Sequence, residues 1–217
     1  ENSNQPFYSK DKKINLFYNG EIYNFTELKE EYFPNSIFRS VGDGEVLLHL
    51  YQKFGIEFIK KVKGMYSIVI CDEINNTTFL IRDRFGIKPL YYFYNKSKFY
   101  FCSEIQPLRN TLHIHKNDLN IDQVNNYFVL GYIFGENRIY SNVKMLKAGT
   151  ILEFDLKTKS TKLTSWFDIK TLSDIYISDN KKLVAKVYEN IADALRYWAR
   201  SDVEKVFALS GGLDSSI

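Results

Sequence analysis

Alternating and helical patterns of apolar residues organise the first part of the chain. Residues 14–18 predict a strand that meets a turn, and residues 26–31 predict a short helix. Residues 44–54 carry apolar side chains at helical spacing, with Asp43 as the expected N-cap and Gly55 at the expected end. This part of the chain therefore begins with a strand and two helices.

From residue 65 onward the pattern changes to strands. The run over 65–72 is almost continuously apolar, so this strand is expected to be buried on both faces. Three antiparallel hairpins are predicted, over residues 65–72 with 77–82, 90–94 with 98–103, and 150–155 with 161–166. Helices followed by an antiparallel meander predict an α+β layered fold.

The last part of the chain has a different pattern. A polar, irregular stretch precedes an amphipathic helix that ends near Trp198, and residues 206–209 predict a short buried strand. A helix, a strand and a Gly-rich loop in this order predict the opening of an α/β nucleotide-binding domain. We therefore divide the chain into residues 1–167, a linker over 168–180, and residues 181–217.

Composition supports a packed globular chain. Apolar residues make up 45% and aromatic residues 16% of the sequence, which is too rich for disorder. The net charge of +3 is spread along the chain, so it gives no support for nucleic-acid binding, and no apolar run approaches the roughly 20 residues of a membrane helix. Cys71 and Cys102 form no metal-spaced cluster or disulfide framework and are expected to be buried structural thiols. We expect a cytoplasmic protein without membrane or nucleic-acid partners.

The two ends of the sequence are unusual. The chain begins with Glu1 rather than Met, and it stops at Ile217 within a Gly-rich loop that would normally open a site. We interpret the sequence as an excerpt of a longer protein.

The strongest motif is Ser210-Gly-Gly-Leu-Asp-Ser-Ser216, directly after the predicted strand. Glycines allow backbone N–H groups to approach an anion, and a following helix would direct its N-terminus at a phosphate. The loop lacks the Gly-Lys-Ser/Thr ending of a Walker A motif. It matches instead the S-G-G-x-D-S loop of enzymes that cleave ATP between the α and β phosphates. The alternative is an ordinary strand-to-helix turn.

Two further motifs have structural interpretations when taken alone. Asn19-Gly20 between apolar residues is typical of a type I′ hairpin turn. Asp43 and Glu45 are typical of a helix N-cap and a first-turn acid. The charged residues of the stretch from Arg82 to Lys88 are interpreted as structural.

Taken together, the motifs resemble a known family. In one order they are Asn19-Gly-Glu-Ile-Tyr-Asn24, Gly42-Asp-Gly-Glu-Val-Leu-Leu48, Gly64-Met65, Arg82-Asp-Arg-Phe-Gly-Ile-Lys-Pro-Leu-Tyr91, Ser103-Glu-Ile105 and Ser210-Gly-Gly-Leu-Asp-Ser215. This order resembles the glutamine-hydrolysing asparagine synthetases of the bacterial B type. The resemblance extends over the chain from about Asn4 onward.

The resemblance implies a class II glutamine amidotransferase domain of the N-terminal-nucleophile fold, with two antiparallel sheets between helical layers. In that family an N-terminal Cys attacks the glutamine amide, and an oxyanion hole stabilises the intermediate. Asn19 and the Gly20 N–H would form the oxyanion hole, while Glu21 and Asp43 would hold the two ends of glutamine, Asp43 its ammonium group. Residue 1 is Glu, so the chain as given is expected to be inactive. Gly42 stands where the family often has Ser.

The resemblance also implies an ATP-pyrophosphatase domain after the first. Aspartate would react with ATP to form an aspartyl adenylate, and ammonia would then displace AMP. Asp214 would help to bind Mg²⁺. The ATP-binding residues would be Ala208, Leu209, Ser210, Gly211, Gly212, Asp214 and Ser215.

The sequence leaves several questions open. One alternative is an amidotransferase that acts on a sugar acid in surface-polysaccharide biosynthesis, and another is a non-catalytic glutamine-binding module. The acceptor pocket is expected beyond Ile217, so residues 1–217 do not distinguish aspartate from another acid. Homodimer formation is likewise open. The expected small-molecule substrates are glutamine, aspartate and ATP.

Overall fold

A computed structural model describes residues 4–95, 98–172, 179–200, 204, 206 and 209–212. The chain divides into two compact units, Glu1–Leu172 and Ser173–Ile217. Each unit is described by itself.

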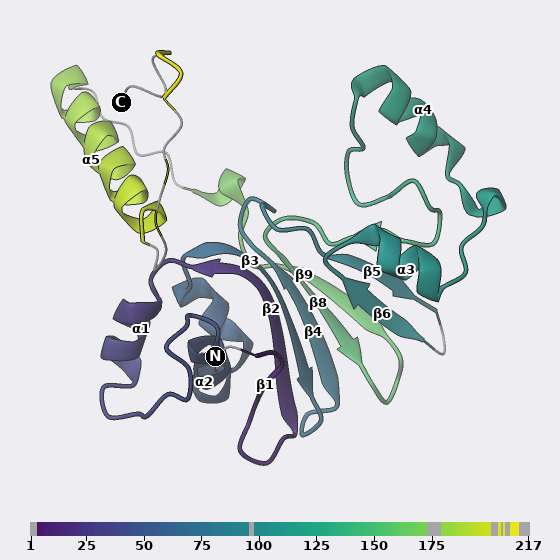
Figure 1. The fold of residues 1–217 in the computed structure, drawn as a ribbon, viewed down its shortest axis with the longest axis horizontal. Helices are drawn as coiled ribbons and strands as arrows, with labels where there is room; N and C mark the ends of the chain where they lie inside the picture. Colours follow the sequence, from purple (N-terminus) through teal and green to yellow (C-terminus); the bar gives the residue numbers. More distant parts are fainter. Residues whose placement is uncertain are drawn as a thin grey trace. The chain divides into compact units, whose positions relative to one another are not determined.

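The first unit is built on a six-stranded antiparallel sheet (Figure 1). The strands follow the order β1-β2-β3-β4-β8-β9. Their bounds are β1 Phe7–Tyr8, β2 Ile14–Ile22, β3 Gly64–Asp72, β4 Thr77–Arg82, β8 Thr150–Asp155 and β9 Thr161–Ser165.

A second antiparallel sheet has three strands in the order β6-β5-β7. They are β5 (Tyr91–Tyr94), β6 (Phe99–Cys102) and β7 (Lys144–Met145). The three predicted hairpins are therefore confirmed, and the central hairpin gains β7 as an additional strand.

Helices lie outside the two sheets. α1, α2 and the 3₁₀ helix η1 pack on the six-stranded sheet, and α3 packs on the three-stranded sheet (Figure 1). The helical elements of this unit are α1 Phe25–Tyr32, α2 Glu45–Phe54, η1 Gly55–Lys61, α3 Ile105–Thr111, η2 Lys116–Asp118, α4 Ile121–Leu130 and η3 Ile169–Thr171. The predicted first two helices and the end of α2 at Gly55 are confirmed.

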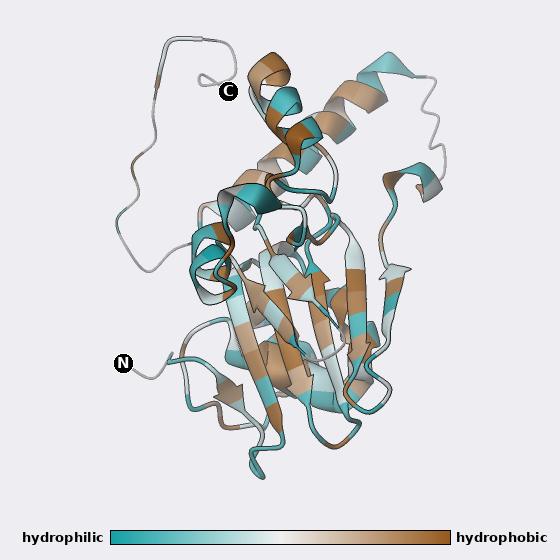
Figure 2. Cartoon of the chain, turned by 90° about the vertical axis from the view of Figure 1, so that its right-hand side faces the viewer, coloured by the Kyte–Doolittle hydropathy of each residue, from teal (hydrophilic) through white to brown (hydrophobic). Residues whose placement is uncertain are grey.

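The layers follow from the alternation of side chains along the strands. On β3, Tyr66, Ile68 and Ile70 belong to the core between the six-stranded sheet and the helices, whereas Val69 belongs to the core between the sheets. This confirms that β3 is buried on both faces. Figure 2 shows the resulting hydrophobic bands along the strands. The α+β architecture, with two antiparallel sheets between helices, is that expected for the N-terminal-nucleophile type.

The hairpin interpretation of Asn19-Gly20 is wrong. β2 continues through both residues to Ile22, and it pairs Asn19 with Ser67 and Gly20 with Tyr66. A local turn signal is overridden here by the neighbouring strand.

The charged stretch after β4 is structural, as predicted. The Arg82 guanidinium donates to the carbonyls of Gly86, Lys88 and Leu146 at 2.6–2.8 Å. Burial lowers the pKa of Arg82, although the neighbouring Asp83 opposes this. The buried Asp83 carboxylate accepts four backbone N–H groups, which fixes the following turn.

Both cysteines lie in strands, as predicted, and both are free thiols. Each is half-buried rather than buried. Cys71 packs against the core between the sheets, and Cys102 packs against the α3 cluster. Burial raises the pKa of the Cys71 thiol.

The second unit contains the predicted long helix, α5 (Asn180–Trp198). Asp179 caps it by accepting the N–H groups of Lys181 and Lys182. The buried strand predicted over 206–209 is wrong at its two described positions. Val206 and Leu209 are irregular and 95% and 77% exposed. Among the helices of the described residues, none has the length and apolarity needed to cross a bilayer.

Candidate functional site

The candidate site lies along one edge of β2. The short strand β1 pairs with β2 only at Asn15 and Leu16, so the second half of β2 extends beyond it. Next to this half, the Gln5 side-chain amide replaces a neighbouring strand. Its Nε2 donates to the Tyr18 carbonyl and its Oε1 accepts the Tyr18 N–H, both at 2.6 Å. The edge is therefore closed at Tyr18 by a side chain.

The Gly20 N–H points to the same edge. Tyr66 is the partner of Gly20 on β3. The Tyr66 N–H donates to the Asp83 carboxylate and its carbonyl accepts the Asp83 N–H, so both groups face the other side of β3. Gly20 and Tyr66 thus form a pair without mutual backbone hydrogen bonds, and in such a pair both backbone groups point outward. The outward edge of β2 accordingly presents the Gly20 N–H between those of Tyr18 and Ile22.

Asp43 reaches this edge from the loop before α2. Its Oδ2 accepts the Ile22 N–H at 2.7 Å and the Tyr18 hydroxyl at 2.5 Å. Both bonds use Oδ2, and within the described part of the chain no hydrogen bond occupies Oδ1. Asp43 therefore presents one carboxylate oxygen that a ligand cation can use.

The predicted N-cap at Asp43 is wrong. α2 begins at Glu45, its N-cap residue is Gly44, and no side chain caps it. The Asp43 carboxylate instead binds the end of β2, because among the described residues no strand pairs with the Ile22 N–H on that edge.

Electrostatics keep the Tyr18 phenol protonated. Burial raises its pKa well above the ordinary value of 10.0, and the Asp43 carboxylate raises it further. Tyr18 is therefore a permanent hydrogen-bond donor to Asp43. The half-buried Lys29 adds positive charge near Asp43, although burial lowers the pKa of its ammonium group.

The structure brings the four predicted glutamine-site residues together. Asn19, Gly20 and Glu21 follow one another on β2, and Asp43 is bonded to the residues on either side of them. The side chains of Asn19 and Glu21 are exposed and alternate with the inward-facing Tyr18.

Sequence reasoning missed Tyr18. Its position directly before Asn19 was the available signal, but only the fold shows that its hydroxyl meets a carboxylate 25 residues away.

The predicted ATP loop is described only in part. Ser210, Gly211 and Gly212 are exposed, Gly211 has a φ of +76°, and the Gly212 N–H donates to Ser210 Oγ at 3.3 Å. A left-handed glycine beside a small hydroxyl fits a loop whose backbone approaches phosphate. The predicted residues Ala208, Asp214 and Ser215 lie outside the described residues.

Several relatives resemble this chain closely. It is 38% identical to the putative glutamine-hydrolysing asparagine synthetase 2 of Methanocaldococcus jannaschii, covering 94% of this chain and 39% of the relative. It is 35% identical to the glutamine-hydrolysing asparagine synthetase 2 of Bacillus subtilis, and the match covers 99% of this chain and 30% of the relative. For asparagine synthetase B of Escherichia coli the identity is 30%, with 98% and 33% covered. The resemblance predicted from the motifs is confirmed, and the chain spans between 30% and 39% of the length of these relatives.

A solved structure shares the fold. It is described as the allosteric regulatory enzyme of purine biosynthesis. The match covers 76% of this chain and 32% of that protein's chain, with a TM-score of 0.51 and 21% sequence identity. The family model of the glutamine amidotransferase domain matches residues 1–167. With the fold, the relatives and this match in agreement, the chain belongs to the glutamine amidotransferase domain family.

Proposed function

We propose that the first unit binds glutamine and that, in the intact protein, the side-chain amide of glutamine is hydrolysed at this site to release ammonia. The observation that carries this proposal is the Asp43 carboxylate. It is held by Tyr18 and the Ile22 N–H through Oδ2, which leaves Oδ1 for the α-ammonium group of an amino acid. A carboxylate fixed in this way pairs well with an ammonium group because its orientation costs little further entropy.

The reacting amide is assigned to the neighbouring residues of β2. The Gly20 N–H points outward along the edge, and the exposed Asn19 side chain carries a second N–H donor. Two such donors can stabilise the negative oxygen of the tetrahedral intermediate. Glu21 is assigned to the other end of glutamine. The nucleophile is expected to be an N-terminal Cys of the intact protein.

For the intact protein we propose asparagine synthesis from aspartate, glutamine and ATP. The names of the relatives support the overall activity. ATP would be a substrate that activates aspartate, and the Gly-rich loop from Ser210 would hold its phosphates. The assignment of Mg²⁺ to Asp214 stays a prediction from the motif.

The test is Asn19→Ala in the intact protein. Loss of one oxyanion donor lowers the rate by about 10²–10³. Glutamine-dependent synthesis should fall by this factor, while synthesis supplied with ammonium salt should remain at the wild-type rate because it bypasses the amide. Glutamate, AMP and asparagine are measured under both conditions.

Equal losses with glutamine and with ammonia would overturn the proposal for Asn19. Formation of an amide on a sugar acid rather than on aspartate would instead contradict only the assigned acceptor. Asn15→Ala, on the same strand and next to β1, serves as the matched control and should leave both activities unchanged.

A further inference from the structure

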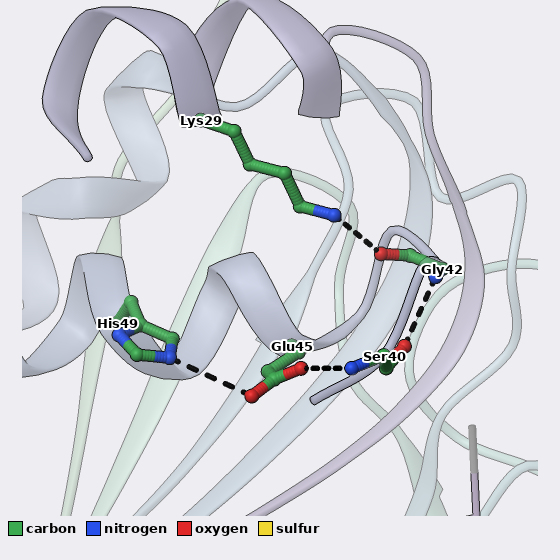
Figure 3. Close-up of polar contacts among 5 residues, drawn as sticks. All are labelled: Lys29, Ser40, Gly42, Glu45 and His49. Atoms are coloured by element: carbon green, nitrogen blue, oxygen red, sulfur yellow. Dashed lines mark hydrogen bonds and ion pairs between the residues drawn. The ribbon is translucent and has the colours of Figure 1, made fainter. Parts of the chain in front are cut away.

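A second group of side chains holds the loop that carries Asp43 (Figure 3). Glu45, in the first turn of α2, accepts the Ser40 N–H through Oε2 at 2.7 Å. Lys29, on α1, donates to the Gly42 carbonyl at 3.0 Å. The loop is therefore bonded from two helices immediately before Asp43.

Glu45 is unusual for a first-turn acid because it is buried. Its exposed fraction is 6%, and its Oε1 lies 3.7 Å from His49 Nε2, one turn further along α2. A buried carboxylate needs hydrogen-bond partners, and the one that Glu45 finds outside the helix is the backbone of Ser40. Ser40 in turn accepts the Gly42 N–H through its hydroxyl at 3.0 Å.

Lys29 completes the arrangement from the other side. Its ammonium group lies over the rings of Phe25 and Phe38, at 5.1 and 4.7 Å from their centres. Glu45 and Asp43 both favour its charged form, against the effect of burial on its pKa. A cation fixed by two rings is well placed to anchor the Gly42 carbonyl.

We propose that Glu45 is a positioning residue for glutamine binding. Through its bond to the Ser40–Gly42 backbone it fixes the position of the Asp43 carboxylate. Lys29 on α1 holds the same backbone from the other side. This inference rests on the proposed glutamine site. It extends that site to two residues whose contacts in the structure are with the Ser40–Gly42 loop rather than with Asn19, Gly20 or Glu21.

Gly42 explains why such support is needed. Glycine has more backbone freedom than any other residue, so the segment that precedes Asp43 has little rigidity of its own. Bonds to the Ser40 N–H and the Gly42 carbonyl remove that freedom on both sides of Val41. The Asp43 carboxylate then meets Tyr18 and Ile22 without a further loss of loop entropy.

The test is Glu45→Met in the intact protein, with glutamine hydrolysis measured as glutamate release. Methionine keeps the length and apolar contacts of the side chain but replaces the carboxylate that accepts the Ser40 N–H with a thioether, which is a weak acceptor. The KM for glutamine should rise about tenfold, since an unpaired buried donor is costly, while kcat changes much less. Glu45→Gln retains an acceptor oxygen and should restore a KM near that of the wild type.

Lys29→Met should raise the same KM by a smaller factor, because Lys29 is only half-buried. The matched controls are Glu57→Met and Lys60→Met. These two residues form an exposed ion pair at 2.6 Å on η1 and should leave the KM unchanged. Synthesis supplied with ammonia and the melting temperature are measured for every variant, to recognise general loss of structure.

A double variant separates positioning from general structure. If Glu45 acts through Asp43, Glu45→Met adds no further rise in KM to an Asp43→Asn protein. A KM in the double variant that rises by the product of the two single effects would overturn the proposal. A loss of kcat and of ammonia-dependent activity without a change in KM would also overturn it. An increase in KM with Asp43→Asn but not with Glu45→Met contradicts only the positioning by Glu45. An unchanged KM with Asp43→Asn contradicts the glutamine site itself.

Discussion

Gly20 on β2 and Gly64 on β3 lie on neighbouring strands. At each position the backbone of the other strand leaves no room for a Cβ. A Cβ at Gly20 would lie less than 3.0 Å from the Met65 carbonyl oxygen, and a Cβ at Gly64 would lie less than 3.0 Å from the Glu21 carbonyl oxygen. Gly20 also has a φ of +150°, which side chains rarely tolerate. The close approach of β2 and β3 thus depends on Gly64 and on Gly20, which belongs to the candidate site.

Gly20→Ala should strongly destabilise the first unit. The new methyl group meets backbone rather than a flexible side chain, so β2 must move away from β3. We expect a loss of about 3 kcal/mol or more in the free energy of unfolding, because overpacking and backbone strain act together. Urea unfolding followed by circular dichroism measures it.

Gly55→Ala is the control for Gly20→Ala. Gly55 also has a positive φ, +58°, but its Cβ would meet open space. Only a backbone cost of about 1–3 kcal/mol is expected there, because with a ψ of −153° Gly55 lies in a region that is almost exclusive to glycine. Equal losses for the two variants would show that the contact with Met65 is unimportant.

Tyr18→Phe should weaken glutamine binding. It removes the hydroxyl that donates to Asp43 Oδ2 and leaves the Ile22 N–H as the remaining partner. We expect the kcat/KM for glutamine hydrolysis to fall about tenfold, which corresponds to one hydrogen bond to a charged group. A wild-type value would contradict the importance of this bond.

The chain offers a matched control for Tyr18→Phe. Tyr51 donates to Asp72 Oδ2 at 2.7 Å, in a second Tyr–Asp pair away from the candidate site. Tyr51→Phe should lower the melting temperature while leaving the KM for glutamine unchanged.

Asp72 should contribute to acid sensitivity. Burial alone would raise its pKa, but hydrogen bonds from Tyr51 and Asn75 together lower it below the ordinary value of 3.8. A group whose pKa is lowered in the folded state stabilises that state above its unfolded pKa. The contribution is lost as pH falls through the lower folded pKa.

Asp72→Asn should therefore cost about 1–3 kcal/mol in the free energy of unfolding at pH 7. The difference from wild type should shrink as the pH is lowered below 3.8. Unfolding by urea at pH 7, 5 and 3 measures both. Two parallel stability curves would contradict a lowered pKa at Asp72.

Asp214→Ala in the intact protein should abolish synthesis with either nitrogen source, because in the proposed reaction the activation of aspartate precedes the use of ammonia. Glutamine hydrolysis should survive at least in part, since that chemistry is assigned to the first unit. A carboxylate beside phosphate requires a cation between them. Pyrophosphate release in the presence of aspartate measures the effect, and a normal rate would contradict the assignment of Mg²⁺ to Asp214.

Sequence patterns predict an element correctly where the spacing of its own apolar residues already marks the face that is buried. The apolar run of β3 and the helical spacing of α2 lead to the correct elements because each pattern already contains the face that packs. α4 was not predicted as a helix, and none of its residues is buried, so packing leaves little signal in its sequence. β1 is too short for a pattern.

The candidate site is less predictable because its contacts are long-range. The strand conformation of Gly20 follows from its pairing with Tyr66 on β3, and the role of Asp43 follows from its bond to the Ile22 N–H. The motifs identify Asn19, Gly20, Glu21 and Asp43 through resemblance. They do not reveal Tyr18 or the bond from Glu45 to Ser40, which depend on the fold.

The short length of β1 also affects how this protein behaves towards other copies of itself. An uncovered strand edge is a template for pairing with another chain, which leads to aggregation. Here the Gln5 amide and the Asp43 carboxylate occupy the backbone groups of Tyr18 and Ile22 that an incoming strand would use. Side chains that shape the proposed glutamine site thereby also protect the sheet from extension, so an apolar residue in place of Asp43 would reduce solubility as well as activity.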